Sequence, residues 1–298
     1  MPELPEVETV RAGLAEHLVR AKVLGIEISD VRSLKRNVSG VQGFVDELTG
    51  STLESVVRRG KFLWLPISSS RALVGHLGMS GQILVRTPDF DPDPQTRVVI
   101  HVQTEAGEPL EIRFVDQRLF GGLMIDDLVP TSDGLAAGFS PEAEASAVIP
   151  STVAHISRDL LDPNFNALAV AEKMAKKNSG IKRVLLDQNL LSGIGNIYAD
   201  ESLWLAKLHY DKQASSIPKK KHLELIEIAA GVLRKAVTQG GTSFDEQYKN
   251  VNGESGYFSQ SLNAYGMTGL PCKRCGTAIK REAWANRGSH FCPKCQKR

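Results

Sequence analysis

Two residues near the start of the chain could carry out covalent chemistry. Pro2 follows the first methionine, which aminopeptidases remove when the next residue is as small as proline, and Glu3 stands beside it. The α-amino group freed in this way has a pKa of about 7.7–8.0, so much of it is neutral and nucleophilic near pH 7. Such an amine attacks electrophilic carbon, and its iminium adduct acts as an electron sink. Many ordinary proteins carry a proline here, so Pro2 alone does not identify an enzyme.

The cysteines offer a second kind of chemistry. All four lie near the end of the chain as two C-x2-C pairs, namely Cys272, Cys275, Cys292 and Cys295. This spacing is typical of a four-cysteine zinc ribbon. Disulfides are the competing interpretation, but no feature of the sequence indicates secretion. We therefore predict one structural Zn²⁺, because four thiolates leave no open position for catalysis.

Positive charge gathers around these cysteines. The formal net charge of the whole chain is only +2, yet from Cys272 onward eight cations stand against one acid, Glu282. This distribution suggests a partner with negative charge more clearly than the composition does. No apolar run approaches the roughly 20 residues that span a membrane, and we see no signal peptide. We therefore expect a soluble, cytoplasmic protein.

The elements that must position these groups change along the chain. Helical spacing of Val7, Val10, Leu14 and Leu18 predicts a helix at the start. Short β-like runs between about residues 23 and 125 predict a two-layer β-sandwich. Residues 131–152 are rich in Ala, Ser, Gly and Pro, and we interpret them as a linker. Helical patterns then cover about residues 166–177, 180–188, 197–207 and 219–239, so the fold class is α+β with several domains.

The segment between the second and third of these helices reads Ser-Gly-Ile-Gly-Asn, at residues 192–196. It suggests a variant of the helix–turn–helix. Its glycines would let backbone amides approach a phosphate closely, and Asn196 at a helix start could donate a further hydrogen bond. A plain helical hairpin with glycines in its turn is the alternative interpretation.

Taken in order, these motifs resemble the formamidopyrimidine-DNA glycosylases of MutM type, a family that also contains endonuclease VIII. The resemblance runs nearly end to end. It rests on the zinc module and on residues 1–9 (MPELPEVET), 58–63 (RRGKFL), 76–81 (HLGMSG), 116–121 (DQRLFG), 192–201 (SGIGNIYADE), 239–242 (QGGT) and 256–258 (GYF). The family organisation implies a catalytic β-sandwich domain at residues 1–135, a helix–two-turn–helix DNA-binding domain at 136–262 and a zinc finger at 263–298.

The resemblance implies a bifunctional DNA glycosylase and AP lyase of base excision repair. An oxidised purine (8-oxoguanine or a formamidopyrimidine) would be flipped out of double-stranded DNA. The Pro2 amine would displace the base through a Schiff base, Glu3 would act as general acid/base, and β,δ-elimination would follow. Lys61 would lie near the phosphate and donate a proton during elimination, and Arg287 would bind the phosphates around the lesion. Glu6 matches a family carboxylate near the site, although a helix dipole explains it equally well.

The same resemblance assigns further residues to DNA binding. Met79, Arg118 and Phe120 match the three residues that fill the space left by the flipped base, and this set favours the MutM branch. Residues 242–257 correspond to the loop that closes over that base. Many relatives carry a histidine where this chain has Gln95, so Gln95 or Arg97 would make that backbone contact. The other matched DNA-binding positions are Lys177, Asn196 and Tyr257.

Two alternatives remain open at this point. The chain could be an endonuclease VIII-like glycosylase for oxidised pyrimidines, or a catalytically silent zinc-ribbon protein that binds damaged DNA. Binding alone needs neither Pro2 nor Glu3, so their presence argues against the second alternative. We expect a monomer that acts on damaged or abasic DNA near the bacterial nucleoid, with zinc as its only metal.

Overall fold

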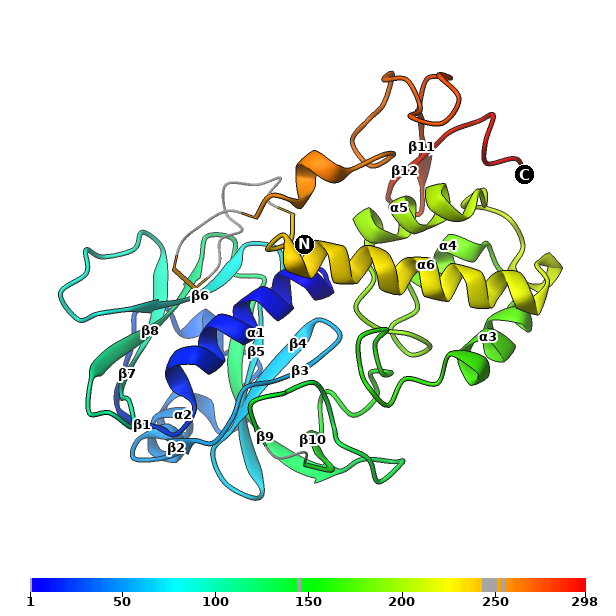
Figure 1. The fold of residues 1–298 in the computed structure, drawn as a ribbon. Coiled ribbons are helices and arrows are strands. Elements are labelled where there is room, and N and C mark those ends of the chain that lie inside the picture. The colour runs from blue at the N-terminus through cyan, green and yellow to red at the C-terminus, as the bar shows by residue number, and fades with distance from the viewer. Residues whose placement is uncertain (1, 144–145, 243–250, 253–255) are drawn as a thin grey trace. The chain divides into compact units, whose positions relative to one another are not determined.

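The computed structural model describes residues 2–143, 146–242, 251–252 and 256–298. The chain divides into two compact units (Figure 1). The first consists of Met1–His155 and Gly240–Gly256, and the second of Ile156–Gln239 and Tyr257–Arg298. Within the described ranges, every helix is too short or too polar to cross a membrane.

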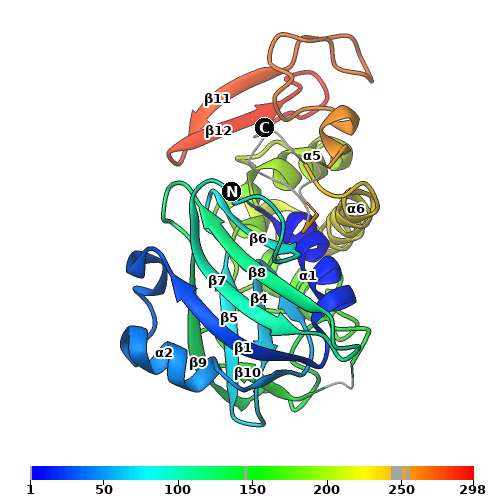
Figure 2. The ribbon, with the colours of Figure 1, turned by 90° about the vertical axis from the view of Figure 1, so that its left-hand side faces the viewer.

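Two five-stranded antiparallel sheets make up most of the first unit (Figure 2). One sheet has the order β2-β1-β7-β8-β6 and the other the order β10-β9-β5-β4-β3. Their strands are β1 (Ala21–Ile28), β2 (Thr52–Leu53), β3 (Val57–Arg59), β4 (Phe62–Pro66), β5 (Arg71–His76), β6 (Gly81–Arg86), β7 (Thr96–Gln103), β8 (Pro109–Asp116), β9 (Gly122–Pro130) and β10 (Val148–Pro150). The unit's helices are α1 (Leu4–Leu18), α2 (Gly40–Leu48) and the short η1 (Val31–Leu34). The predicted β-sandwich with a helix at its start is confirmed.

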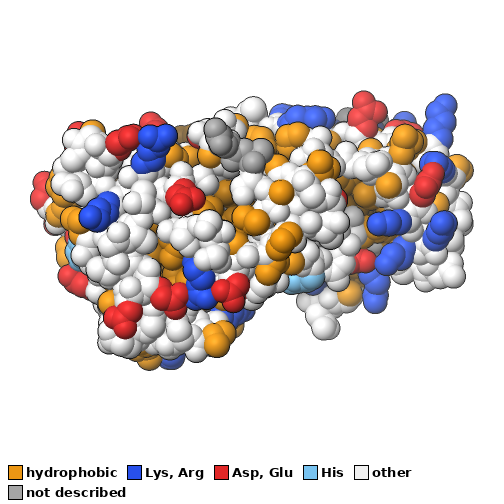
Figure 3. Space-filling view, turned by 90° about the horizontal axis from the view of Figure 1, so that it is seen from below, with side chains coloured by type: hydrophobic (Ala, Val, Ile, Leu, Met, Phe, Trp, Pro, Cys, Tyr) orange, Lys and Arg blue, Asp and Glu red, His pale blue; other side chains and the backbone are white. Residues whose placement is uncertain are grey.

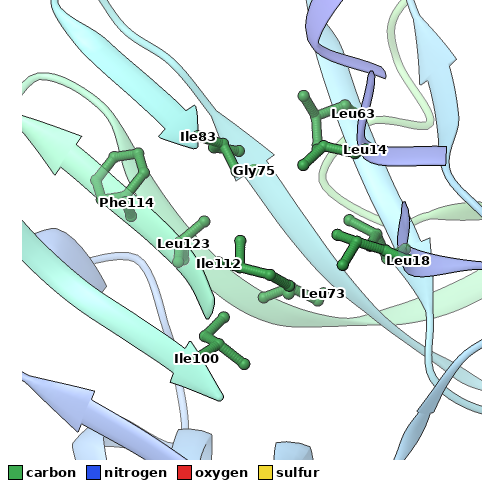
Figure 4. A pocket seen from close by; sticks show the side chains of 11 residues that line it. Leu14, Leu18, Leu63, Leu73, Gly75, Ile83, Ile100, Ile112, Phe114 and Leu123 are labelled. Carbon is green, nitrogen blue, oxygen red and sulfur yellow. The ribbon is translucent and has the colours of Figure 1, made fainter. Parts of the chain in front are cut away.

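Helix α1 is held by its apolar side chains. Pro5 lies in its first turn, where the missing N–H of proline removes no helical hydrogen bond. Leu14 and Leu18 are buried and line an apolar pocket with side chains from both sheets. Figure 4 shows that the leucine and isoleucine side chains lining this pocket point toward one another, with Gly75 on β5 among them. The start of α1, which carries Pro2 and Glu3, is therefore anchored by the core of the sandwich.

The stretch at residues 131–152 is not a linker, and that interpretation was wrong. Its last part forms β10, which pairs with β9. Phe139 exchanges two backbone hydrogen bonds with Arg58, at 3.0 and 2.8 Å. A Cβ atom on Gly138 would lie 2.5 Å from the Arg58 carbonyl oxygen, so a small residue is required there. Gly138, at least, is small because it packs against β3.

The second unit is helical with a zinc-ribbon hairpin. Its helices are α3 (Ala167–Ala175), α4 (Ile181–Leu185), α5 (Asn196–Ala206) and α6 (Lys219–Thr238), with short 3-10 turns η2 (Ala214–Ser216) and η3 (Phe258–Ser261). The hairpin consists of β11 (Lys280–Trp284) and β12 (Arg287–Phe291). The four helices predicted from the sequence are all present. On the face shown in Figure 3, Lys and Arg side chains gather over this helical unit.

Candidate active site

The first residues of the chain form a buried group at the start of α1. Pro2 is buried, and only 2% of Glu3 is exposed. The backbone N–H of Glu3 donates to Glu6 Oε2 at 2.9 Å, so Glu6 reaches back over the helix start. Met1 lies outside the described residues, and the Pro2 amine exists only once Met1 has been removed. These contacts hold Glu3 next to the proposed nucleophile.

Glu6 also binds the segment that follows α6. Its Oε1 accepts hydrogen bonds from the backbone N–H of Thr242 at 2.7 Å and from the Thr242 hydroxyl at 2.9 Å. The preceding Gly240 and Gly241 have φ values of +73° and +79°, which favour glycine. Glu6 thus ties the start of the chain to the start of the predicted loop at residues 242–257. Most of that loop (243–250 and 253–255) lies outside the described residues.

A buried ionic network fixes the strand that precedes Lys61. Arg58, which is fully buried, donates to Glu8 Oε2 on α1 at 2.7 Å, and Arg11 donates to Glu8 Oε1 at 2.9 Å. Arg11 also forms two hydrogen bonds with Glu142, at 2.7 and 2.9 Å. Lys61 follows Gly60 in the turn between β3 and β4. Because Arg58 belongs to β3, the network fixes α1 and the Lys61 turn against each other.

His76 was not singled out from the sequence, although it opens one of the motifs. It ends β5, and its ring lies 5.0 Å from the Phe62 ring, measured between centroids. Burial, followed by the nearby cations Arg36 and Lys61, lowers the pKa of His76 to about 4. Its Nδ1 accepts the N–H of Gly78 at 3.2 Å, which leaves Nε2 as the N–H donor of a neutral ring. A neutral histidine beside Lys61 adds a hydrogen-bond donor to this region.

Met79, Arg118 and Phe120 are predicted to fill the space left by the flipped base, and we call them the wedge residues. They lie on two adjacent turns. Met79 is 39% exposed and Phe120 is 46% exposed, so both apolar side chains are accessible from solvent. The guanidinium carbon of Arg118 lies 5.0 Å from the centroid of the Phe120 ring. The structure therefore brings Arg118 and Phe120 together on one turn, and Met79 lies on the other.

Gln95 and Arg97, the two residues proposed in place of the family histidine, differ in how many internal contacts their side chains make. Gln95 is exposed, and its φ is +65°. Arg97 instead donates to the Asp116 carbonyl oxygen at 2.9 Å and to Gln95 Oε1 at 2.7 Å, and it lies 3.5 Å from Asp30. These internal contacts leave Arg97 less available for DNA than Gln95.

In the second unit, the turn between α4 and α5 is held by Gln188. Its Nε2 donates to the carbonyl oxygens of Leu186 and Ile194, both at 3.0 Å, and its Oε1 accepts the N–H of Gly193 at 3.0 Å. The Gly193 amide therefore serves the turn itself. Lys177 is exposed and forms an ion pair with Asp187 at 3.2 Å.

Arg287 lies at the tip of the hairpin in the same unit. Ala285 and Asn286 have φ values of +45° and +62°, as expected for a tight two-residue turn between paired strands. Asn196 donates to the carbonyl oxygen of the next residue, Gly288, at 3.1 Å. Arg287 itself is exposed, so the hairpin presents one cation from a fixed tip.

A buried ion pair lies below that tip. Lys182 Nζ lies 2.6 Å from Asp200 Oδ1, and both side chains are 0% exposed. Lys182 also donates to the Gly288 carbonyl oxygen at 3.2 Å and to the Ser289 hydroxyl at 2.8 Å. Asp200 Oδ2 accepts the backbone N–H of His290 at 2.8 Å. The acidic end of the 192–201 motif thus anchors β12, a role that the sequence did not indicate.

The four cysteines fit a zinc ion. Their Sγ atoms all lie within 4.8 Å of one another. Zn–S bonds of about 2.3 Å in a tetrahedron place the sulfurs about 3.8 Å apart. Hydrogen bonding from Thr277 lowers the pKa of Cys275 to about 6, whereas burial raises the pKa of Cys292 to about 12. Four thiolates this close repel one another, and a bound Zn²⁺ removes that repulsion.

Comparison with known proteins agrees with this arrangement. Family models match residues 1–123 (formamidopyrimidine-DNA glycosylase N-terminal domain), 156–247 (formamidopyrimidine-DNA glycosylase H2TH domain) and 269–298 (zinc finger found in FPG and IleRS). The formamidopyrimidine-DNA glycosylase of Leifsonia xyli is 53% identical over 299 residues, with all of both chains covered. This chain belongs to the formamidopyrimidine-DNA glycosylase family.

Solved structures of the glycosylase family extend the comparison to the whole fold. Lactococcus lactis Fpg in complex with DNA containing an abasic site has a TM-score of 0.80 and 31% identity, with 99% of this chain and 100% of that chain covered. MutM in complex with DNA containing carbocyclic 8-oxo-G has a TM-score of 0.81 and 30% identity, with both chains fully covered. The predicted glycosylase resemblance, fold class and zinc finger are confirmed.

Tyr257 completes the set of positions matched to the glycosylase family. Its side chain is 71% exposed, and its backbone N–H donates to the Gln239 carbonyl oxygen at 2.9 Å. It is the last residue of the 242–257 segment. A large exposed aromatic ring with a hydroxyl suits contact with a phosphate or a base.

Proposed function

We propose that the chain is a bifunctional DNA glycosylase and AP lyase that removes oxidised purines from double-stranded DNA. The observation that carries the proposal is the buried group at the start of α1. There, Glu3 lies beside Pro2, and Glu6 bonds to the Glu3 N–H and to Thr242. A protein that only binds DNA has no need of a carboxylate buried beside its N-terminal amine.

In the proposed reaction, the amine of mature Pro2 attacks the anomeric carbon of the damaged nucleotide. The bond from that carbon to the base breaks, and the sugar ring opens as Glu3 transfers a proton to its oxygen. The resulting iminium acidifies the neighbouring sugar hydrogens, so both flanking phosphates are eliminated in turn. The product is a one-nucleotide gap with phosphate on both ends.

Other residues bind the DNA or assist the elimination in this proposal. Lys61 neutralises a phosphate and donates a proton during elimination, and Arg287 binds phosphate through its planar guanidinium. Zn²⁺ held by the four cysteines stabilises the ribbon that presents Arg287 and takes no part in the reaction. Gln95, Lys177, Asn196 and Tyr257 are proposed DNA contacts. We place this work in the bacterial cytoplasm, at the nucleoid, since the relatives are bacterial repair enzymes.

Base release and DNA binding can be measured separately to test the proposal. Pro2→Gly and Glu3→Gln should abolish release of 8-oxoguanine while binding to the same duplex on a gel is retained. The wild-type product should run as a strand ending in phosphate on each side of the gap. Parallel loss of release and binding in both variants would contradict the roles assigned to Pro2 and Glu3.

A further inference from the structure

We propose that the buried carboxylate of Asp116 is a positioning residue that locks the two wedge-bearing turns together and thereby sets how the enzyme reads the base opposite the lesion. The inference rests on the proposed function, because it concerns how Met79, Arg118 and Phe120 are presented to DNA. No contact of Asp116 with DNA or with the reacting atoms is involved.

One carboxylate bonds to both turns. Asp116 is the last residue of β8 and is 0% exposed. Its Oδ1 accepts a hydrogen bond from the Ser80 hydroxyl at 2.6 Å, and Ser80 belongs to the turn that carries Met79. The same Oδ1 accepts the backbone N–H of Arg118 at 3.1 Å, and Oδ2 accepts the N–H of Gly121 at 2.8 Å. The turn from Arg118 to Gly121 is therefore tied at both of its ends.

The backbones of the two turns also touch directly. A Cβ atom on Gly78, whose φ is +61°, would lie 2.4 Å from the Gly121 nitrogen and 2.5 Å from the Phe120 carbonyl carbon. A Cβ atom on Gly121 would lie 2.7 Å from the His76 carbonyl oxygen. Because no side chain separates the turns, a shift of one must move the other.

The second turn holds a backbone conformation that needs such support. Leu119 has a φ of +56°, in the left-handed region that a leucine rarely adopts. That conformation persists only where the surroundings enforce it. The Asp116 bonds act on either side of Leu119, and Lys35 Nζ donates to the Leu119 carbonyl oxygen at 2.9 Å. Without the carboxylate, the turn can relax and the directions of Arg118 and Phe120 change.

A wedge must be stiff to work. Unstacking a base step costs free energy, and the inserted side chain recovers it only if it enters at the correct place. Arginine distinguishes bases through hydrogen bonds from a planar fork, so small changes in its direction alter its selectivity. Asp116 thus controls the directions of Arg118 and Phe120, and through them the selectivity for the base opposite the lesion.

The test compares two buried carboxylates of the same unit. Asp116→Asn keeps the shape, but its single acceptor oxygen leaves the N–H of either Arg118 or Gly121 facing an NH₂ group. Asp126→Asn is the matched control: Asp126 is 9% exposed, accepts the Thr152 N–H at 2.9 Å and the Ser151 hydroxyl at 2.8 Å, and belongs to β9. Single-turnover release of 8-oxoguanine is measured opposite cytosine and opposite adenine. Schiff-base trapping on a single-stranded abasic oligonucleotide, which needs no wedge, is measured beside it.

We expect Asp116→Asn to change the cytosine-to-adenine rate ratio by about tenfold, the discrimination of one good arginine–base contact. Trapping on the single strand should stay within about twofold of wild type. Asp126→Asn should keep the wild-type ratio. Ser80→Ala removes one of the three hydrogen bonds to Asp116, together with the 3.2 Å bond from the Arg118 N–H to the Ser80 hydroxyl. It should shift the ratio in the same direction by less, and it serves if Asp116→Asn does not fold.

An unchanged ratio in both Asp116→Asn and Ser80→Ala would overturn the inference, as would an equal change in Asp126→Asn. A wild type that acts equally on both duplexes would overturn it too. Failure of the proposed function looks different, because the wild type itself would then release no base from either duplex.

Discussion

The two units of the chain fix their proposed reactive groups with different ionic arrangements. In the first unit, Glu8 is shared by two arginines, and Arg11 continues to Glu142, whose side chain is 38% exposed. In the second unit, Lys182 and Asp200 form a pair with both side chains at 0% exposure. The network around Glu8 reaches water through Glu142, whereas Lys182 and Asp200 form a sealed pair, by which we mean that both side chains are fully buried.

This difference predicts unequal tolerance to change. Where a network reaches the surface, a group that loses its partner can be hydrated or can use a second partner. Where a pair is sealed, removing one charge leaves the other buried without compensation, which costs far more. The second unit also depends on a metal, and the first unit contains no comparable cysteine cluster among its described residues. We therefore expect the hairpin that carries Arg287 to be the more fragile part.

The largest effect is expected at the zinc ribbon. Cys292→Ser removes one thiolate from a site whose metal contributes about 10–16 kcal/mol in small zinc modules. The ribbon should unfold and DNA affinity should be lost, while hydrogen–deuterium exchange of the first unit stays unchanged. Zinc content and a binding gel check this. A variant that binds DNA normally without zinc would contradict the structural role of the metal.

Breaking the sealed pair should have the next largest effect. Lys182→Met removes the Lys182 cation and leaves the buried Asp200 with only its contacts to the His290 N–H and the His290 ring, at 2.8 and 3.0 Å, and it should lower the free energy of unfolding by about 3–5 kcal/mol. Lys221→Met is the control, since Lys221 pairs with Glu224 near the surface and should change stability by about 0.5 kcal/mol. Urea unfolding measures both. Equal effects of the two substitutions would remove the contrast between sealed and open pairs.

Removing one charge from the network around Glu8 should lower the free energy of unfolding by less than breaking the Lys182–Asp200 pair. Glu8→Gln keeps one acceptor oxygen and leaves Arg11 paired with Glu142, but it removes the negative charge beside the buried Arg58. We expect a loss of about 1.5–3 kcal/mol. Glu16→Gln, on the exposed side of the same helix, should be nearly silent. A loss at Glu8 that exceeds the loss at Lys182, in the same urea experiment, would reverse the comparison.

The effect that is smallest at neutral pH concerns His76, and it grows as the pH falls. His76 has an ordinary pKa of 6.5, which burial lowers to about 4, so between these values the unfolded chain binds a proton that the folded chain does not. Stability should therefore fall as the pH drops from about 6.5 to about 4. His76→Gln should remove this part of the pH dependence. Curves of unfolding free energy against pH that coincide for wild type and variant would show that His76 is not held neutral.

The sequence predicted the elements with strong periodicity and the sites with strong spacing. Helix α1, the helices of the second unit and the cysteine cluster were predicted in this way, because each is encoded by neighbouring residues. The strands were predicted together, as short runs between about residues 23 and 125, and the end of β9 and all of β10 lie beyond that range. The packed stretch before β10 looked like a linker because residues that are small for close packing resemble residues that are small for flexibility.

The contacts that hold the site together could not be predicted. Glu8 with Arg58, Lys182 with Gly288, and Asp116 with Ser80 join residues far apart in the chain. Asp200 in particular belonged to the 192–201 motif, which was used only for the family resemblance, and only the fold shows that it bonds to His290. Long-range pairs of polar groups leave no periodic signal in a single sequence.

The most direct test of the account is borohydride trapping of the mature protein on a duplex with one 8-oxoguanine opposite cytosine. The protein used is first confirmed to begin at Pro2 and to contain zinc. The account predicts a covalent adduct between protein and DNA that maps to Pro2. An adduct formed only with an oxidised pyrimidine would place the enzyme in the endonuclease VIII branch. An adduct at another amine, or none on either duplex, would contradict the assignment of Pro2 as the nucleophile.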